Sequence, residues 1–363
     1  MKTTKGWSFL LLSLTLAFGW AQQEVRILNW NIARSVGANN PESERQPYTA
    51  KIMNHLRPDI MILQEVGGNT SGWNALNQEQ ALDTFIRNNL TFFGSTPQRN
   101  RDYYLYVNRL SDGWISNAIV SRFPLISATD VSIGSPNRGL TIGRIDVPGT
   151  NGLGVMGVHF KAGGTTNDAV TRQTNAENTR NRVLEWRRQN RRSALVLGGD
   201  LNENEDPDLT ASFQIGGTLP DGRTYAPIST VKSARLRDPV PLDGLGTKRT
   251  YQITASNTTP RRRLDHLFVS ATEPGRDRIN ILEAIIFNTR RMPNLPSSFN
   301  IDDSPNASDH AALFYRIRID RWQSIGNSDA GYWVPEPNSL LQLVVLVSGS
   351  GIWLGVRWRR AKA

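Results

Sequence analysis

Short apolar runs and stretches with helix-like spacing alternate along most of the chain. Continuous or alternating apolar patterns predict strands at residues 25–32, 60–63, 154–160 and 195–199. Residues 47–56, 76–88 and 168–192 have the apolar spacing of helices. Further strands are predicted at residues 103–107, 114–123, 264–269 and 311–319. This alternation predicts one layered α/β domain over about residues 24–322.

The buried run at residues 195–197 is followed by polar side chains. It ends in Gly198 and Gly199 and then presents Asp200 and Asn202, which share one face by period two. The carboxylate can orient or deprotonate a water, and the amide can donate to a charged phosphoryl oxygen. The same pattern also fits a strand-end turn whose aspartate caps the next loop.

Three more predicted strands end on polar side chains. Asn31 lies near the end of the first strand, where an amide can be purely structural. Glu65 follows the apolar run 60–63, and a carboxylate at that point is costly to bury without a partner. Glu65 is therefore a candidate metal ligand. His159 ends the strand at residues 154–160, where it can equally be a satisfied histidine of the sheet.

Histidine is rare in this chain, and its distribution is informative. Three of the four histidines, His159, His266 and His310, lie in short polar motifs at strand ends. His266 follows Asp265, and His310 follows Asp309. An arbitrary distribution would rarely place them so, and these motifs are candidates for acid-base chemistry.

The composition limits the chemistry. The 363 residues include no cysteine, which excludes disulfides, thiolate catalysis and cysteine-ligated zinc or iron-sulfur sites. Oxygen and imidazole ligands remain, so any metal is expected to be hard. The formal net charge is +10, but both ends are basic and contain no acidic residue. The high isoelectric point is therefore weak evidence for nucleic-acid binding.

The first residues have the composition of a targeting segment. Residues 1–21 combine early lysines, an apolar run from Trp7 to Phe18, and small residues before Gln22. This pattern predicts a secretory signal peptide that is cleaved after Ala21. A buried first helix is the alternative.

The C-terminal end has a linker, an apolar span and a basic tail. The linker, residues 323–337, ends in a Pro-Glu-Pro triplet, and residues 338–363 contain an apolar span and then an arginine cluster. The span at 339–356 is just long enough to cross a bilayer. This order resembles the PEP-CTERM sorting signal of Gram-negative bacteria. The resemblance implies export, removal of the span by a sorting enzyme, and delivery to the cell envelope, the cell surface or the medium. A permanent membrane anchor is the alternative.

Seven short motifs occur in order between residues 25 and 319. They are Asn-Trp-Asn, Gln-Glu-Val, Ser-Asn-Ala-Ile-Val-Ser-Arg-Phe-Pro, Val-His-Phe-Lys, Gly-Asp-Leu-Asn, Leu-Asp-His-Leu-Phe-Val-Ser and Ser-Asp-His. Each is weak alone, but the ordered set resembles the endonuclease/exonuclease/phosphatase superfamily, with its deoxyribonuclease I-like fold. The resemblance implies a four-layer α/β/β/α sandwich of two β-sheets flanked by helices, with the site at one edge.

The resemblance also implies roles for single residues. Asn31 and Glu65 hold a divalent metal, most often Mg²⁺, with Mn²⁺ or Ca²⁺ as alternatives. Asp200 and Asn202 orient the nucleophile and the phosphoryl oxygens. One firm acidic ligand is enough, because Mg²⁺ usually keeps several waters and takes one or two protein carboxylates.

Further implied roles concern proton transfer. Asp309 pairs with His310, which acts as base or as transition-state donor, and Asp265 lies near the scissile phosphate, often as a histidine partner. His159 serves the leaving-group side, as in the branch that contains deoxyribonuclease I and the bacterial sphingomyelinases. Together with a cation, these groups can neutralise the phosphoryl oxygens, activate a water and protonate the leaving alkoxide.

Two features depart from the deoxyribonuclease I pattern. Gly67 and Gly68 follow Gln-Glu-Val, where that enzyme has an arginine that enters the minor groove. Duplex-DNA binding of that type is therefore in doubt. The acidic partner of the leaving-group histidine has no clear counterpart at residues 95–97, and Asp102 is the candidate substitute.

The first hypothesis is an exported, monomeric, metal-dependent nuclease acting on DNA or RNA. The arginines at 261–263 and in 168–192 can contact a phosphate backbone or form solvated faces only. The second hypothesis is a sphingomyelinase-like or sugar-phosphate phosphodiesterase or phosphatase, which the lack of an obvious aromatic hairpin for membrane insertion disfavours. The third is a non-catalytic surface binding protein, against which the complete set of polar site residues argues.

Overall fold

The computed structural model describes residues 24–37, 42–68, 74–110, 112–134, 138–203, 214–251, 260, 262–324, 331–333, 341–348 and 351–358. The chain divides into two compact units. One is Gln23–Val334, and the other combines Met1–Gln22 with Pro335–Ala363.

The larger unit contains two six-stranded sheets. The first sheet consists of β1 (Glu24–Asn31), β2 (Ile60–Val66), β3 (Tyr104–Val107), β4 (Ser116–Ser121), β11 (Arg278–Phe287) and β12 (Ala312–Asp320). The second consists of β5 (Leu125–Val131), β6 (Leu140–Ile145), β7 (Leu153–His159), β8 (Ala194–Asp200), β9 (Leu236–Arg237) and β10 (Asp265–Ser270). Their strand orders are β11-β12-β1-β2-β4-β3 and β5-β6-β7-β8-β10-β9.

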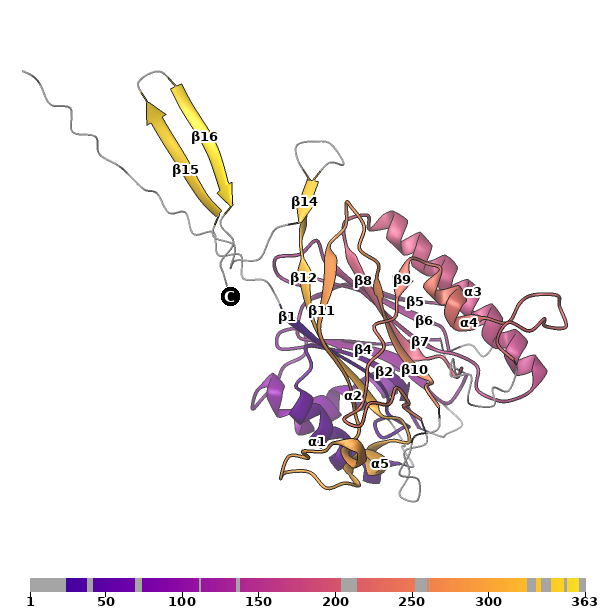
Figure 1. Ribbon diagram of the computed structural model, residues 1–363. Helices are drawn as coiled ribbons and strands as arrows, with labels where there is room; N and C mark the ends of the chain where they lie inside the picture. Colours follow the sequence, from indigo (N-terminus) through magenta and orange to yellow (C-terminus); the bar gives the residue numbers. More distant parts are fainter. Residues whose placement is uncertain are drawn as a thin grey trace, which may run out of the picture. The chain divides into compact units, whose positions relative to one another are not determined.

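Helices cover the outer face of each sheet (Figure 1). They are α1 (Gln46–Leu56), α2 (Ala75–Asn89) and α5 (Asp303–Ala307) beside the first sheet, and α3 (Thr166–Gln189) and α4 (Pro227–Lys232) beside the second. Three 3-10 turns, Ser43–Arg45, Thr91–Phe93 and Thr289–Arg291, lie in connecting segments. The predicted four-layer α/β/β/α sandwich is confirmed.

Three apolar clusters separate the four layers. The middle cluster fills the space between the sheets with side chains such as Ile27, Ile62 and Val196, all fully buried. Each outer cluster joins one sheet to its helices. Burial of each such side chain contributes about 1.5–3 kcal/mol to the free energy of unfolding. The two sheets are therefore held as one rigid support for the residues at their ends.

Every strand and helix expected from the apolar pattern is present, with ends shifted by a few residues. The pattern missed β5 and β11, each of which lies at one edge of its sheet and has many exposed or half-buried positions. It also missed β6, β9, α4 and α5. An edge strand buries too little apolar surface to give a clear alternation.

The two sheets approach each other closely at Gly198. A Cβ atom at this position would lie 2.6 Å from the side-chain oxygen of Asn29 on the facing sheet. Only a residue without a side chain fits there. Gly198 thus lets β8 approach β1 directly behind the site.

The described residues after β12 form two small hairpins. β13 (Trp322–Ser324) pairs with β14 (Gly331–Trp333), so part of the predicted linker is a hairpin. Where the sequence predicts a membrane span, β15 (Leu341–Ser348) pairs with β16 (Gly351–Trp358). The described part of the chain contains no helix that is long and apolar enough to cross a membrane. The predicted signal peptide and the Pro335-Glu336-Pro337 triplet lie outside the described residues.

Candidate active site

The second sheet places three of the predicted site residues in one row. β7 runs parallel to β8 with His159 opposite Asp200, and β10 runs antiparallel to β8 with Asp265 opposite Asp200. Residues at the same level of neighbouring strands point to the same face. Apolar residues on that face belong to the cluster between the sheets. His159, Asp200 and Asp265 therefore point into the end of the inter-sheet space.

The first sheet contributes Asn31, Glu65 and His310 from the facing side. Asn31 ends β1, and Glu65 lies on the neighbouring parallel strand β2. The pairing of β2 with β4 shifts its register between Leu63 and Val66, and Glu65 has a φ of 57°. Such a bulge re-aims a side chain, and here it turns Glu65 toward Asn31. His310 lies two residues before the start of β12, the other neighbour of β1.

Asn31 connects the two halves of the site. Its Nδ2 donates to Oε1 of Glu65 and to Oδ2 of Asp200, both at 3.0 Å. Its Oδ1 accepts the backbone N–H of Ala33 at 3.0 Å. The amide oxygen is thus engaged, and the immediate task of Asn31 is to hold two carboxylates together. Metal ligation by Asn31 stays a prediction.

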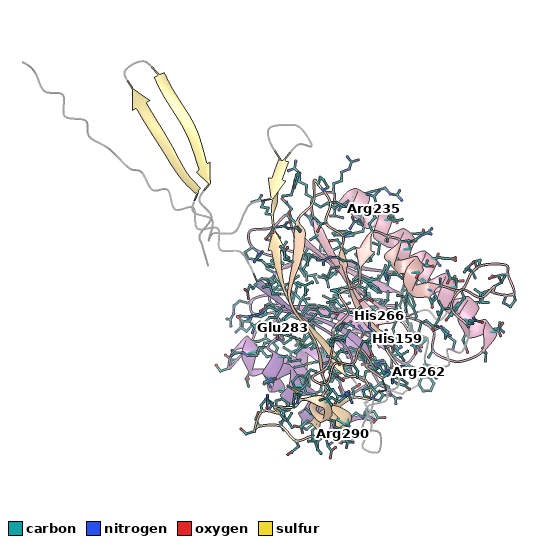
Figure 2. All side chains as sticks on the ribbon, in the orientation of Figure 1. His159, Arg235, Arg262, His266, Glu283 and Arg290 are labelled. Carbon is teal, nitrogen blue, oxygen red and sulfur yellow. The ribbon has the colours of Figure 1, made fainter. Side chains whose placement is uncertain are left out.

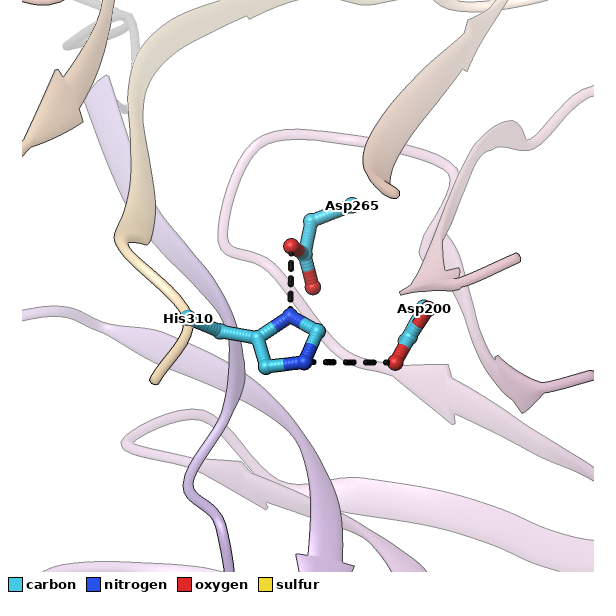
Figure 3. A group of neighbouring side chains, drawn as sticks. All are labelled: Asp200, Asp265 and His310. Carbon is cyan, nitrogen blue, oxygen red and sulfur yellow. Dashed lines mark hydrogen bonds and ion pairs between the residues drawn. The ribbon is translucent and has the colours of Figure 1, made fainter. Parts of the chain in front are cut away.

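His310 lies between two buried carboxylates (Figure 3). Its Nδ1 lies 2.8 Å from Oδ2 of Asp265, and its Nε2 lies 3.7 Å from Oδ2 of Asp200. Burial alone lowers the pKa of His310, but the two carboxylates outweigh it and raise that pKa well above its usual value. Burial in turn raises the pKa of Asp200 to about 7. His310 is therefore protonated at neutral pH and can donate to a phosphoryl oxygen.

The sequence pairs His310 with Asp309 and names Asp265 as a residue that is often a histidine partner. The first pairing is wrong and the second is observed. The carboxylate that bonds to the ring is that of Asp265, which lies across the sheet on β10. Asp309 is half-buried, and no hydrogen bond or ion pair joins it to His310 in the described structure. Its charge only helps to raise the pKa of His310. Adjacency in the chain did not bring the two side chains together.

His159 faces Asp200 from the opposite side. Its Nε2 lies 3.5 Å from Oδ2 of Asp200 and 3.9 Å from Oε1 of Glu65. Burial lowers the pKa of His159 well below its usual value, and the positive charges of Arg138 and His310 lower it further. His159 is therefore neutral at neutral pH, and in this state it accepts a proton before it can donate one.

The substitute partner predicted for His159 lies elsewhere. Asp102 accepts the backbone N–H of Gln98 at 2.8 Å and pairs with Arg101 at 2.7 Å. The carboxylates that approach the ring of His159 are those of Asp200 and Glu65.

Asn202 lies just beyond the row of β-strand residues. It has a φ of 50°, in the left-handed region that non-glycine residues rarely adopt. Its backbone N–H donates to Oδ1 of Asp200 at 2.8 Å, and its Nδ2 donates to the carbonyl of Phe160 at 3.1 Å. The side chain is half-buried. Its predicted role as a donor to a phosphoryl oxygen stays a prediction.

The donors at this site fit a hard divalent cation. The carboxylates of Glu65 and Asp200 converge on Nδ2 of Asn31, and the Glu65 side chain keeps 24% of its exposure. Oxygen ligands with access to solvent suit Mg²⁺, which keeps several of its waters. Burial raises the pKa of Asp200 to about 7, so a nearby cation would stabilise its charged form. Glu65 and Asp200 are therefore the residues that would hold the cation.

A second group also lies close enough to share a cation. Ligand atoms of Asp200, Asp265 and His310 all lie within 4.8 Å of one another. The ring of His310 is already bonded to Asp265 through Nδ1, and a metal on that nitrogen would break this bond. The nitrogen of His310 that remains for a metal at this group is Nε2, which faces Oδ2 of Asp200.

Sequence reasoning missed two residues beside the site. Arg138 donates to the carbonyl of Phe160 at 3.2 Å and lowers the pKa of His159. The ring of Tyr251 lies 4.7 Å from the ring of His310. Both come from loops without apolar periodicity. The one sequence feature that could have indicated Tyr251 was the Thr250-Tyr251 pair, which lies ten residues before the basic run at 261–263.

The arginines at 261–263, which were candidates for phosphate contacts, differ in burial. Arg263 is buried and pairs with Asp238 at 2.7 Å, so it is structural. Arg262, labelled in Figure 2, is exposed and pairs through its backbone with Tyr251, which in turn pairs with His310. Arg261 lies outside the described residues.

The family comparison covers nearly the whole larger unit. The model of the Endonuclease/Exonuclease/phosphatase family matches residues 28–310. This range includes every predicted site residue from Asn31 to His310. No curated protein matches the chain.

Several solved structures have a similar fold. A mannosyl-6-phosphatase from Bacteroides thetaiotaomicron is 15% identical, with a TM-score of 0.52 over 81% of this chain and 99% of that chain. A family protein from Leptotrichia buccalis is 16% identical, with a TM-score of 0.52 over 81% and 99%. TDP2 from D. rerio, in complex with a single-strand DNA product, is 13% identical, with a TM-score of 0.51 over 82% and 99%. At these identities the likeness shows the fold.

Proposed function

This chain belongs to the endonuclease/exonuclease/phosphatase family, and from that premise we propose that it is an exported, Mg²⁺-dependent phosphodiesterase that hydrolyses nucleic acid. One observation carries the proposal. His310 and His159 flank the carboxylate of Asp200, with their Nε2 atoms 3.7 and 3.5 Å from the same oxygen, Oδ2. The surroundings raise the pKa of His310 and lower that of His159. Hydrolysis of a phosphodiester needs both a hydrogen-bond donor and proton acceptors around one phosphorus atom.

The groups divide the reaction between them. A water oxygen bonds to phosphorus as its proton passes to the carboxylate of Asp200, which acts as the base. His310 donates to the phosphoryl oxygen, where negative charge develops. The bond from phosphorus to the leaving oxygen breaks, and that oxygen takes a proton from His159. An anionic substrate beside His159 raises the pKa of its ring, which lets the ring take up the proton that it later delivers.

A bound Mg²⁺ would neutralise charge on the phosphoryl oxygens. Glu65 and Asp200 would hold it, and Asn31 keeps these two carboxylates in place. Mn²⁺ and Ca²⁺ also take oxygen ligands and are the alternatives.

Basic side chains near the site favour a nucleic-acid substrate. Arg262 is exposed, and half-buried Arg138 and Lys161 lie beside the end of β7. Arginine and lysine contacts to phosphates position a nucleic-acid backbone. The D. rerio TDP2 structure, which has the same fold, contains a single-strand DNA product, and this also supports the choice. The chain is proposed to act as a monomer.

The deciding experiment compares substrates with and without metal. The purified chain is incubated with DNA, RNA, sphingomyelin, mannose 6-phosphate and bis-(p-nitrophenyl) phosphate. Hydrolysis of DNA or RNA and of the aryl diester is expected, with loss of activity in EDTA and recovery in Mg²⁺. Glu65→Gln should raise the Mg²⁺ concentration needed for half-maximal rate. Activity that survives EDTA would contradict the metal assignment, and hydrolysis of the sugar monoester or the lipid alone would contradict the substrate class.

Export is proposed from the composition of the two ends. The signal-like residues 1–21 and the Pro335-Glu336-Pro337 triplet before an apolar span support secretion and removal of the span by a sorting enzyme. Mass spectrometry of protein released from cells should find a chain that begins near Gln22 and ends near Glu336. An intact Arg359-Arg360 tail in the mature protein would favour a permanent anchor.

A further inference from the structure

A buried charged cluster lies beneath the loops that follow β7 and β8. It consists of Arg172 on α3, Glu203 after β8, and Tyr225 before α4, with exposures of 0%, 2% and 0%. Nε of Arg172 lies 2.8 Å from the hydroxyl of Tyr225 and 3.3 Å from Oε2 of Glu203. The Tyr225 hydroxyl donates to the same carboxylate oxygen. The three side chains thus bond to one another away from solvent.

Arg172 also bonds to the loop that follows His159. Its Nη1 donates to the carbonyls of Lys161 and Gly163, at 3.1 and 2.7 Å. Glu203, its ion-pair partner, directly follows Asn202 in the other loop. One guanidinium therefore joins the two loops that leave the active site from neighbouring strands.

Asn202, in one of these loops, has an unfavourable backbone conformation and bonds to the other loop. Asn202 has a φ of 50°, and its Nδ2 bonds to the carbonyl of Phe160, the residue after His159. A left-handed backbone at a non-glycine residue persists only when its surroundings fix it. The contacts of Glu203 hold the residue that comes next in the chain, so they restrict the backbone of Asn202.

The cluster is poorly explained by stability alone. A buried ion pair loses in desolvation much of what it gains in attraction, and apolar replacements of both partners are often neutral or stabilising. Its value lies instead in fixed geometry, because a guanidinium bonds to several acceptors in set directions. We propose that Arg172 is a positioning residue that sets the place of Asn202, and through Phe160 that of His159, during phosphodiester hydrolysis. This proposal rests on the catalytic role of Asn202 in the proposed function.

The test uses a double-mutant cycle on the full chain. Arg172→Met, Asn202→Ala and the double variant are compared on bis-(p-nitrophenyl) phosphate, well below the unfolding temperature. Misplacement of a catalytic group by about 1 Å costs about 10²-fold, so Arg172→Met should lower kcat by about 10- to 100-fold with KM nearly unchanged. If Arg172 acts through Asn202, the double variant should be no slower than Asn202→Ala. Independent, multiplying losses would overturn the proposal.

A matched control lies on the same helix. Arg187 is also buried and pairs with Glu273 at 2.6 Å, roughly 22 Å further along α3 by the rise per residue. This pair also contacts Arg235, which lies at the opposite end of the sandwich from His159 (Figure 2). Arg187→Met should lower the unfolding temperature without changing kcat. An equal loss of kcat in both variants would show a structural role only.

A milder variant keeps the test decisive if Arg172→Met does not fold. Tyr225→Phe removes one hydroxyl from the cluster and keeps the ring, and it should fold and lower kcat several-fold. An unchanged kcat would overturn the proposal. If the wild-type chain hydrolyses no phosphodiester at all, the proposed function fails instead, so the two failures are distinguishable.

Discussion

Strand β10 contributes one residue to each of two buried histidine-aspartate pairs, and the rings of the two pairs have different surroundings. Asp265 bonds to Nδ1 of His310 at 2.8 Å. The next residue, His266, contacts Asp238 through its own Nδ1 at 3.3 Å. Neighbouring residues of a strand point to opposite faces, so Asp265 faces the inter-sheet space and His266 faces away from it.

The surroundings of the second ring nitrogen separate the two pairs. Nε2 of His310 faces Oδ2 of Asp200 in the site. Nε2 of His266 is buried without a hydrogen-bond partner among the described residues, and its ring stacks on Phe268 with centroids 5.5 Å apart. The His310–Asp265 pair is therefore placed for proton transfer, because its ring faces the site. We expect the His266–Asp238 pair to be structural, because its ring is enclosed by apolar packing.

Disruption of the His310–Asp265 pair is expected to lower kcat more than any other change considered. His310→Ala and Asp265→Asn should each lower kcat by about 10²–10⁴-fold, the contribution of a positioned acid-base group. Asp309→Asn is the matched control, because it changes a neighbouring carboxyl that makes no bond to the ring, and it should retain most of the activity. The measurement is kcat on bis-(p-nitrophenyl) phosphate at saturating Mg²⁺. Equal losses for Asp309→Asn and Asp265→Asn would restore the pairing that the sequence suggests.

The effect of the leaving group is expected to distinguish His159 from His310. His159→Ala should slow cleavage of an oligonucleotide by about 10²-fold, because a natural alkoxide needs a proton to depart. The nitrophenolate of the aryl diester is stable unprotonated and should be slowed little. His310→Ala should slow both substrates alike, since it acts on the phosphoryl group. Equal losses for His159→Ala on the two substrates would reject its role as the leaving-group acid.

The structural pair should affect stability rather than rate. His266→Phe keeps an aromatic ring against Phe268 and removes the contact with Asp238, which leaves a buried carboxylate with one partner fewer. The free energy of unfolding should fall by about 1–3 kcal/mol, as measured by urea denaturation, while kcat stays close to that of the wild type. A loss of kcat like that of His310→Ala would mean that the two pairs do not differ in role.

The smallest expected effect is a change in acid stability. Burial alone raises the pKa of Asp238, but His266 and Arg263 outweigh it and hold that pKa well below its usual value. A depressed carboxyl pKa stabilises the fold above the unfolded value of about 3.9, and this contribution is lost as the pH falls toward the folded value. Asp238→Asn should therefore flatten the decline of unfolding free energy below about pH 4, measured in urea at several pH values. Identical slopes in both proteins would contradict the assignment.

The sequence by itself determined most of the elements and placed the candidate site residues at the ends of strands. Strand and helix periods are local properties, so the apolar pattern predicted most of the strands and the longer helices of both sheets. The ordered motifs placed Asn31, Glu65, His159 and Asp200 at strand ends, and the structure joins all four by contacts of 3.9 Å or less. The family assignment followed from the same motifs and is confirmed.

Only the tertiary structure decided which charges meet. His310 pairs with Asp265 rather than with its neighbour Asp309, because the register of β10 against β8 places Asp265 beside Asp200, and the ring of His310 meets both from the facing sheet. The opposite protonation states of His310 and His159 also depend on burial and on charges from distant strands. The spacing of residues along the chain does not reveal how distant strands pair or how deeply a side chain is buried. These two properties set the pKa values of groups in a protein interior.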